Sequence, residues 1–194
     1  MPDFSIYSEH SLGFSHYGEV TAEGEGVVTL TDSEVQQLVD LIKENGGETD
    51  VEALDLENKY PEIYETLDEA YREAAFQAVY YHWVVAGYEN GWYEVDLDDA
   101  IEKCESNYGF HFDFDEEKYR EENGLDPDDE IDEDELYDEK SEAFDKWVEQ
   151  YRATLDREAE VSFLCDVFEL DPDVDTPDYE VMIPDGVIEL AEKE

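Results

Sequence analysis

Apolar residues follow two different spacings along this chain, and these predict a β-rich beginning and a mainly helical remainder. Residues 4–30 combine strand-forming residues, such as the run Val27-Val28-Thr29-Leu30, with glycines at turn positions, which predicts β-structure. From residue 35 onward, apolar positions recur every three or four residues, which predicts a helix. The preceding sequence Thr31-Asp32-Ser33-Glu34 matches a capping box, in which side chains satisfy the free amides of a helix N-terminus.

The longest predicted helix runs from about residue 61 to residue 88. Its first half is apolar on one face, whereas residues 76–86 are apolar on almost every side. That second pattern is typical of a helix that is buried on most sides. We therefore expect this helix to form the centre of the core, with Val79, Trp83 and Val84 buried.

Two helices and a strand are predicted in the middle of the chain. Asp96 can cap a helix whose apolar side ends near Tyr108, and a second amphipathic helix covers about residues 136–155. Between them, three phenylalanines alternate with His111 and Asp113 in residues 110–114. This alternation predicts a strand with one aromatic face.

The end of the chain completes an α+β pattern. An apolar run occupies residues 161–168, a strand is expected at Tyr179–Ile183, and a short helix is expected after Pro184. The predicted fold is α+β and helix-dominated, with a long central helix and short β elements near the N-terminus, mid-chain and C-terminus. We expect a single acidic domain over residues 1–194, and the thin apolar pattern near 115–132 is where a subdivision would fall.

The charge of the chain changes this picture more than any motif does. There are 59 Asp and Glu against 11 Lys and Arg, a formal net charge of −48. Yet 41% of the residues are hydrophobic and 13% are aromatic, far more than in disordered acidic tails, which cannot bury enough apolar surface to fold. The chain should therefore fold despite the self-repulsion that opposes a compact state. The large negative charge must then be explained by something other than disorder.

Nothing in the sequence indicates catalysis. The histidines His10, His16, His82 and His111 are scattered, and no phosphate-binding loop or nucleophile motif is present. Carboxylates are so dense that chance pairs are uninformative about acid–base chemistry. Two runs of alternating acids, beginning at Asp126 and Asp171, lack the glycine that calcium-binding loops need at their sixth position. We predict that the chain is not an enzyme and has neither a cofactor nor a dedicated metal site.

The densest acidic run is the best candidate for a functional surface. Residues 113–142 hold 17 acids and three bases. A solvated loop and helix start explain such a run in an ordinary protein, since acids favour a helix N-terminus, but the excess here extends over the whole chain. We predict that the run binds a partner through Asp126, Asp128, Asp129, Glu130, Asp132, Glu133, Asp134, Glu135, Asp138 and Glu139.

Three explanations of the charge stay open. Adaptation to high salt fits the scarcity of lysine but fits less well with the excess of Glu over Asp. An acidic immunity protein or chaperone would use the charge to bind a basic partner. A nucleic-acid mimic would place carboxylates where a nucleic acid places phosphates, in the basic groove of another protein.

We favour the nucleic-acid mimic. In composition and size the chain resembles acidic inhibitors that phages and mobile elements direct against restriction and CRISPR systems, although it carries no motif of a particular family. The expected partner is a basic nucleic-acid-binding protein or nuclease complex, and we expect no direct nucleic-acid binding and no membrane association. The first residues carry no basic and apolar signal segment. We therefore expect a cytoplasmic location, in the host cytosol if the chain is phage-encoded.

Overall fold

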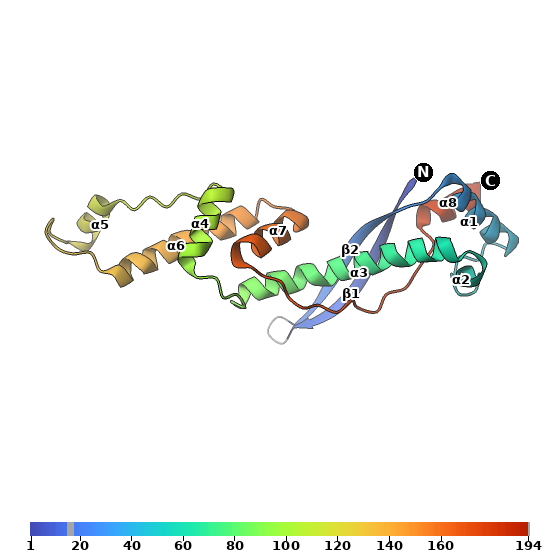
Figure 1. Ribbon diagram of the computed structural model, residues 1–194, viewed down its shortest axis with the longest axis horizontal. Coiled ribbons are helices and arrows are strands. Elements are labelled where there is room, and N and C mark those ends of the chain that lie inside the picture. The colour runs from blue at the N-terminus through green and yellow to red at the C-terminus, as the bar shows by residue number, and fades with distance from the viewer. Residues whose placement is uncertain (15–17, 194) are drawn as a thin grey trace. The chain divides into compact units, whose positions relative to one another are not determined.

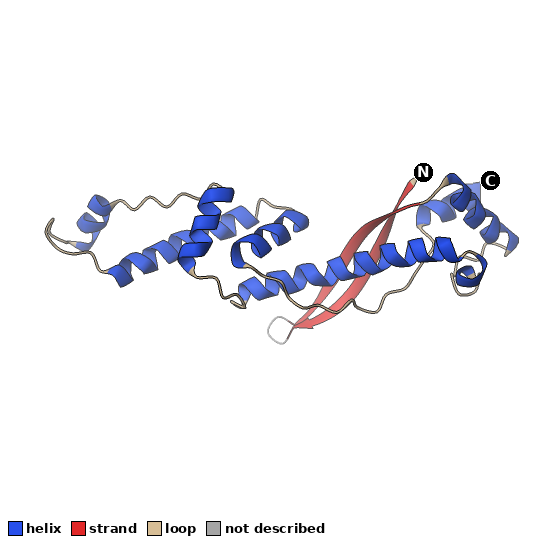
Figure 2. Cartoon of the chain, in the orientation of Figure 1, coloured by secondary structure: helices blue, strands red, loops and turns tan. Residues whose placement is uncertain are grey.

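The computed structural model describes residues 1–14 and 18–193, without the side chains of residues 14, 18 and 19. It is α+β and helix-dominated, as the sequence predicts. Figures 1 and 2 show one β-hairpin followed by a series of helices. In chain order the elements are β1 (Asp3–Phe14), β2 (Gly18–Thr29), α1 (Asp32–Glu44), α2 (Leu56–Lys59), α3 (Pro61–Glu89), α4 (Leu97–Asn107), α5 (Glu116–Asn123), α6 (Glu133–Arg152), α7 (Arg157–Phe168) and α8 (Asp185–Lys193).

The chain divides into two compact units, each with its own core. Unit 1 comprises Met1–Trp83 and Pro172–Glu194, and unit 2 comprises Val84–Asp171, so one division falls inside α3. Both units are strongly acidic, with 27 acids and 4 bases in unit 1 and 32 acids and 7 bases in unit 2. The expected single domain stays a prediction.

Unit 1 is built on the hairpin, whose strands pair in an antiparallel register with Phe4 opposite Val28. Alternation along the strands buries one face, because successive side chains point to opposite sides of a sheet. On that face lie Phe4, Ile6 and Val28, each less than a tenth exposed. Helices α1 and α8, the α2 turn and the first part of α3 close the remainder of this core.

The capping box before α1 is confirmed. The Thr31 hydroxyl accepts from the Glu34 amide at 3.2 Å, and the Glu34 carboxylate accepts from the Thr31 amide at 2.6 Å. Two amides that the helix leaves free are thereby satisfied locally. Leu38 and Ile42 then face the core of unit 1.

Unit 2 has an aromatic core between α4, α6 and α7. The Phe163 ring is 1% exposed and lies with its centroid 4.9 Å from Tyr108, 5.1 Å from Tyr151 and 6.2 Å from Trp147. Edge-to-face and tilted rings at such distances pack favourably. Aliphatic residues such as Val148 complete the core.

Both predicted strands outside the hairpin are wrong. Residues 109–115 and 169–184 contain no strand, since no other segment of the described chain pairs with them and a strand needs a ladder partner. The phenylalanines instead pack against helices: Phe110 lies 5.1 Å from Trp147, and Phe114 lies 5.3 Å from Tyr119. The aromatic alternation thus reflects packing, not pairing.

The long helix is confirmed, but one of its expected core residues is not. Val79 and Val84 are buried as predicted, at 3% and 0% exposure. Trp83 is only half-buried, so that part of the prediction is wrong. Residues 76–86 are apolar on almost every side of the helix, and the neighbouring elements do not cover all of this apolar surface, so the Trp83 side chain stays partly exposed.

Helix α5 is not predicted by the pattern of apolar residues, because it has almost no apolar side to give a helical period. Its boundaries are set by local capping instead. Asp115 accepts a hydrogen bond from the Lys118 amide at 3.0 Å, and Gly124 ends the helix at φ +66°, a left-handed conformation that favours glycine. Only Tyr119 of this helix is buried.

Candidate functional site

The ten predicted partner-binding acids lie together in unit 2 and are all exposed. Asp126, Asp128, Asp129 and Glu130 lie in the loop between α5 and α6, and Asp132 is the N-cap of α6, where it accepts from the Asp134 amide at 2.9 Å. The other five lie in the first two turns of α6. The structure therefore presents the run as one surface, which we call the acidic segment, residues 126–139.

One arginine holds the loop of the acidic segment. The Arg120 guanidinium donates to the main-chain carbonyls of Asp126 at 2.9 Å and Asp129 at 2.6 Å, and to the Glu116 carboxylate at 2.9 and 2.7 Å. Its side chain is 16% exposed. The five N–H groups of a guanidinium in a rigid fork suit such a multiple contact.

A tyrosine of α5 holds the helical part of the same segment. The Tyr119 hydroxyl donates to the Glu135 carboxylate at 2.5 Å. This hydrogen bond, together with burial and the negative charge of Glu135, raises the pKa of Tyr119 to about 12. The hydroxyl therefore stays protonated and remains a donor at neutral pH.

The acidic surface continues along α6 beyond the predicted residues. Glu135, Asp138, Glu142, Asp145 and Glu149 follow one another at intervals of three and four residues, which places them on one side of the helix. All five are exposed, whereas Phe144 and Val148 on the opposite side are buried. We call these five the acidic stripe.

The sequence could have identified the whole stripe. Glu142, Asp145 and Glu149 fall on the polar side of the helix predicted for residues 136–155, but only the densest run was assigned to a partner. With a rise of about 1.5 Å per residue, the stripe is about 21 Å long. Burial, and then the neighbouring Glu149, raises the pKa of Asp145, so like charges are crowded at this end.

Basic side chains of unit 2 are largely engaged within the unit. Arg152 is 16% exposed, binds Glu160 at 2.8 Å and lies over the Tyr88 ring at 4.8 Å. Lys103 binds Glu169 at 2.7 Å, and Lys140 pairs with Asp98. Lys146 differs, because it is exposed and lies four residues after Glu142 and three before Glu149, on the same side of α6 as the stripe. The stripe therefore faces solvent as five carboxylates with one lysine among them, and its net charge stays strongly negative.

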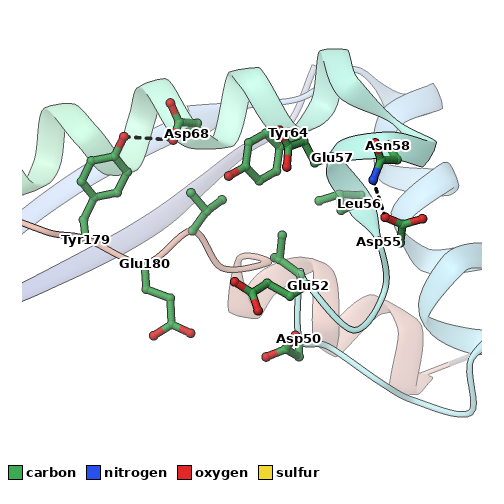
Figure 3. A pocket seen from close by; sticks show the side chains of 12 residues that line it. Asp50, Glu52, Asp55, Leu56, Glu57, Asn58, Tyr64, Asp68, Tyr179 and Glu180 are labelled. Carbon is green, nitrogen blue, oxygen red and sulfur yellow. Dashed lines mark hydrogen bonds between the residues drawn. The ribbon is translucent and has the colours of Figure 1, made fainter.

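Unit 1 contains a separate acidic hollow of about 700 Å³ (Figure 3). Its lining contains no lysine or arginine. It contains six carboxylates, which belong to Asp50, Glu52, Asp55, Glu57, Asp68 and Glu180. The Tyr179 hydroxyl donates to Asp68 at 2.9 Å. Burial, followed by the charges of Glu57, Asp68 and Glu52, raises the pKa of Tyr64. Such a hollow favours cations and repels phosphate-bearing ligands.

The histidines and cysteines stay scattered. Ser8 and His10 form a hydrogen bond of 2.6 Å on β1, but within the described residues no carboxylate orients His10. His82 lies on α3, His111 is exposed, and His16 lies outside the described residues. No cluster of three His, Cys, Asp or Glu suited to a metal occurs in the part of the chain that the structure describes. The absence of catalysis and of a metal site stays a prediction.

Cys104 and Cys165 do not pair with each other. Burial, and then the charge of Asp166, raises the pKa of Cys104 to about 12. Because the thiolate is the reactive form, Cys104 is an unreactive core thiol.

Comparison with known proteins gives no relative: no family model, curated protein or solved structure matches the chain. Among the described residues, no helix is both long and apolar enough to cross a membrane. The surface chemistry of the chain is therefore what supports a function.

Proposed function

We propose that the protein is an acidic nucleic-acid mimic that occupies the basic groove of a DNA- or RNA-handling protein and thereby inhibits it. The observation that supports this most directly is the acidic stripe on α6, which is continuous with the acidic loop. It carries five carboxylates over about 21 Å. A DNA strand displays one phosphate per ~3.4 Å, hence about six over the same length.

The similarity in charge density matters because a basic groove binds phosphates mainly through lysine and arginine. A helix with carboxylates along one side offers such a groove comparable charge on a rigid support. Lys146 is the one base set among the five acids of the stripe, so that side of α6 stays negative. Inhibitors of this kind serve phages and mobile elements against restriction and CRISPR nucleases, which would place the protein in the cytosol of the infected cell.

The test has two stages. The tagged chain is used to capture proteins from a bacterial lysate at about 50 mM salt and again at about 200 mM, a range over which phosphate-type contacts lose much of their affinity. A captured nucleic-acid-binding protein is then loaded with a short fluorescent duplex, and the chain is titrated in. We expect the duplex to be displaced and the displacement to weaken steeply with salt.

A matched pair of triple variants locates the contact. Asp138→Asn, Glu142→Gln and Glu149→Gln remove three charges from the acidic stripe. The control removes three exposed charges from unit 1, with Glu44→Gln, Glu62→Gln and Glu65→Gln, so both variants have the same net charge. We expect only the stripe variant to lose competition markedly.

Each outcome has a distinct meaning. Equal losses in both variants would show that net charge, and not the stripe, drives binding. Simultaneous binding of duplex and chain to the captured protein would exclude mimicry and leave an immunity-protein or chaperone role. Capture of a broad mixture of basic proteins, with no discrete complex, would favour the chaperone.

A further inference from the structure

The acidic segment is more ordered than its composition implies. Residues 126–135 contain eight acids and no base, and such charged stretches normally repel themselves and extend. Here the loop is folded back on itself. The Asp126 amide donates to the Asp129 carboxylate at 2.8 Å, and the Asp129 amide donates to the Asp126 carbonyl at 3.0 Å.

Two adjacent residues of α5 hold the two parts of this segment. Arg120 donates to the Asp126 and Asp129 carbonyls in the loop, and Tyr119 donates to Glu135 in the first turn of α6. The Leu125 amide also donates to the Arg120 carbonyl at 2.9 Å. Arg120 is thus hydrogen-bonded to the loop through both its guanidinium and its main-chain carbonyl.

We infer that Arg120 is a positioning residue that holds the acidic segment in one conformation, so that the chain recognises a basic surface of fixed shape in preference to a flexible basic tail. This inference rests on the proposed function for its binding part, and it narrows the partner class to a folded protein with a basic surface of fixed shape. Preorganised surfaces bind more tightly because less ordering remains to be done on association.

Whether Arg120→Gln strengthens or weakens binding to a basic partner distinguishes a positioning role from simple charge attraction. Arg120→Gln makes the chain more negative, so long-range attraction alone predicts equal or tighter binding to any cation. Positioning predicts weaker binding, because the loop carbonyls lose their donor. Lys118→Gln is the matched control: Lys118 is on the same helix, its side chain is 68% exposed, and it forms a loose ion pair with Glu122 at 3.8 Å.

The first measurement needs no partner. Amide hydrogen exchange of residues 124–132 is compared in the wild-type chain, Arg120→Gln and Lys118→Gln. We expect faster exchange at the Asp126 and Asp129 amides in Arg120→Gln only. Arg120→Lys retains the charge but not the fork, and we expect it to restore the protection only in part. Far-ultraviolet circular dichroism of each variant shows whether α5 has been lost as a whole.

The second measurement uses two defined probes at low salt, a folded homeodomain and a flexible oligo-arginine peptide. We expect Arg120→Gln to lose affinity for the homeodomain by about tenfold relative to Lys118→Gln, as when a loop must be ordered on binding. Affinity for the oligo-arginine peptide should be unchanged or slightly higher.

The outcomes are separable. Identical exchange and identical binding in the two variants would overturn the positioning role. If the wild-type chain binds oligo-arginine but not the homeodomain, the inferred preference for a fixed surface is wrong. If exchange in the loop responds as expected but the wild-type chain binds neither probe, the proposed function fails and the ordering by Arg120 stands.

Discussion

Gly24 on β2 lies so close to Ala74 on α3 that a Cβ atom at this position would overlap the Ala74 carbonyl oxygen. Ala78, one helical turn further along, also borders the same site. The hairpin therefore approaches α3 backbone to backbone. Only glycine permits this approach without a shift of the backbone.

We expect Gly24→Ala to destabilise the protein by about 1–3 kcal/mol, the usual cost of overpacking a well-packed site. Urea unfolding followed by circular dichroism measures the loss. Gly13→Ala is the control, since nothing lies within 4 Å of a Cβ atom there. Equal stability of the two variants would show that the hairpin does not rest on α3 as described.

Phe163 should be the most costly single truncation in unit 2. It is 1% exposed and contacts rings from α6 and the end of α4. We expect Phe163→Ala to lower the free energy of unfolding by about 3–5 kcal/mol. Tyr137→Ala, at a position 53% exposed on α6, should cost less than ~1 kcal/mol. A small effect at Phe163 would contradict the aromatic core.

Alkaline pH should destabilise the fold through its tyrosines. Burial is the main cause that raises the pKa of Tyr71, Tyr88 and Tyr108 to about 12, and the hydrogen bond to Asp166 contributes at Tyr108. In the unfolded chain these hydroxyls ionise near pH ~10. Their contribution to stability is therefore complete below pH ~10 and is lost as the pH rises toward about 12, because the unfolded state releases its protons first.

Urea midpoints measured between neutral pH and the alkaline limit test this dependence. We expect a progressive fall above pH ~10. Tyr108→Phe should flatten part of that fall, since phenylalanine has no hydroxyl to ionise. A midpoint that does not change with alkaline pH would mean that these hydroxyls are freely solvated.

Added salt should stabilise the protein. Both units carry a large excess of acids, and the Debye length shrinks from about 30 Å at 0.01 M to about 10 Å at 0.1 M. Screening then relieves repulsion between carboxylates, so the melting temperature should rise over this range. Differential scanning calorimetry measures it. A flat or falling melting temperature would contradict the repulsion, and a requirement for molar salt to fold would favour adaptation to a saline medium.

Much of the local structure follows from the sequence because its determinants lie within a few residues of one another. The capping box before α1, the N-cap Asp96 of α4 and the span of α3 depend on contacts within a turn or two of the helix itself. The exposure of the ten predicted acids also follows from the residue type alone, because a carboxylate without a partner is costly to bury.

What the tertiary structure decided depends on residues that are distant in sequence. Residues 110–114 have a strand-like pattern but meet helices in place of a second strand, so their rings pack instead of pairing. The sequence shows Arg120 only as one of 11 bases; the fold aligns its guanidinium with the carbonyls of Asp126 and Asp129. Composition determined that the surface is acidic, whereas the return of the loop onto α5 decided that part of this surface has a fixed shape.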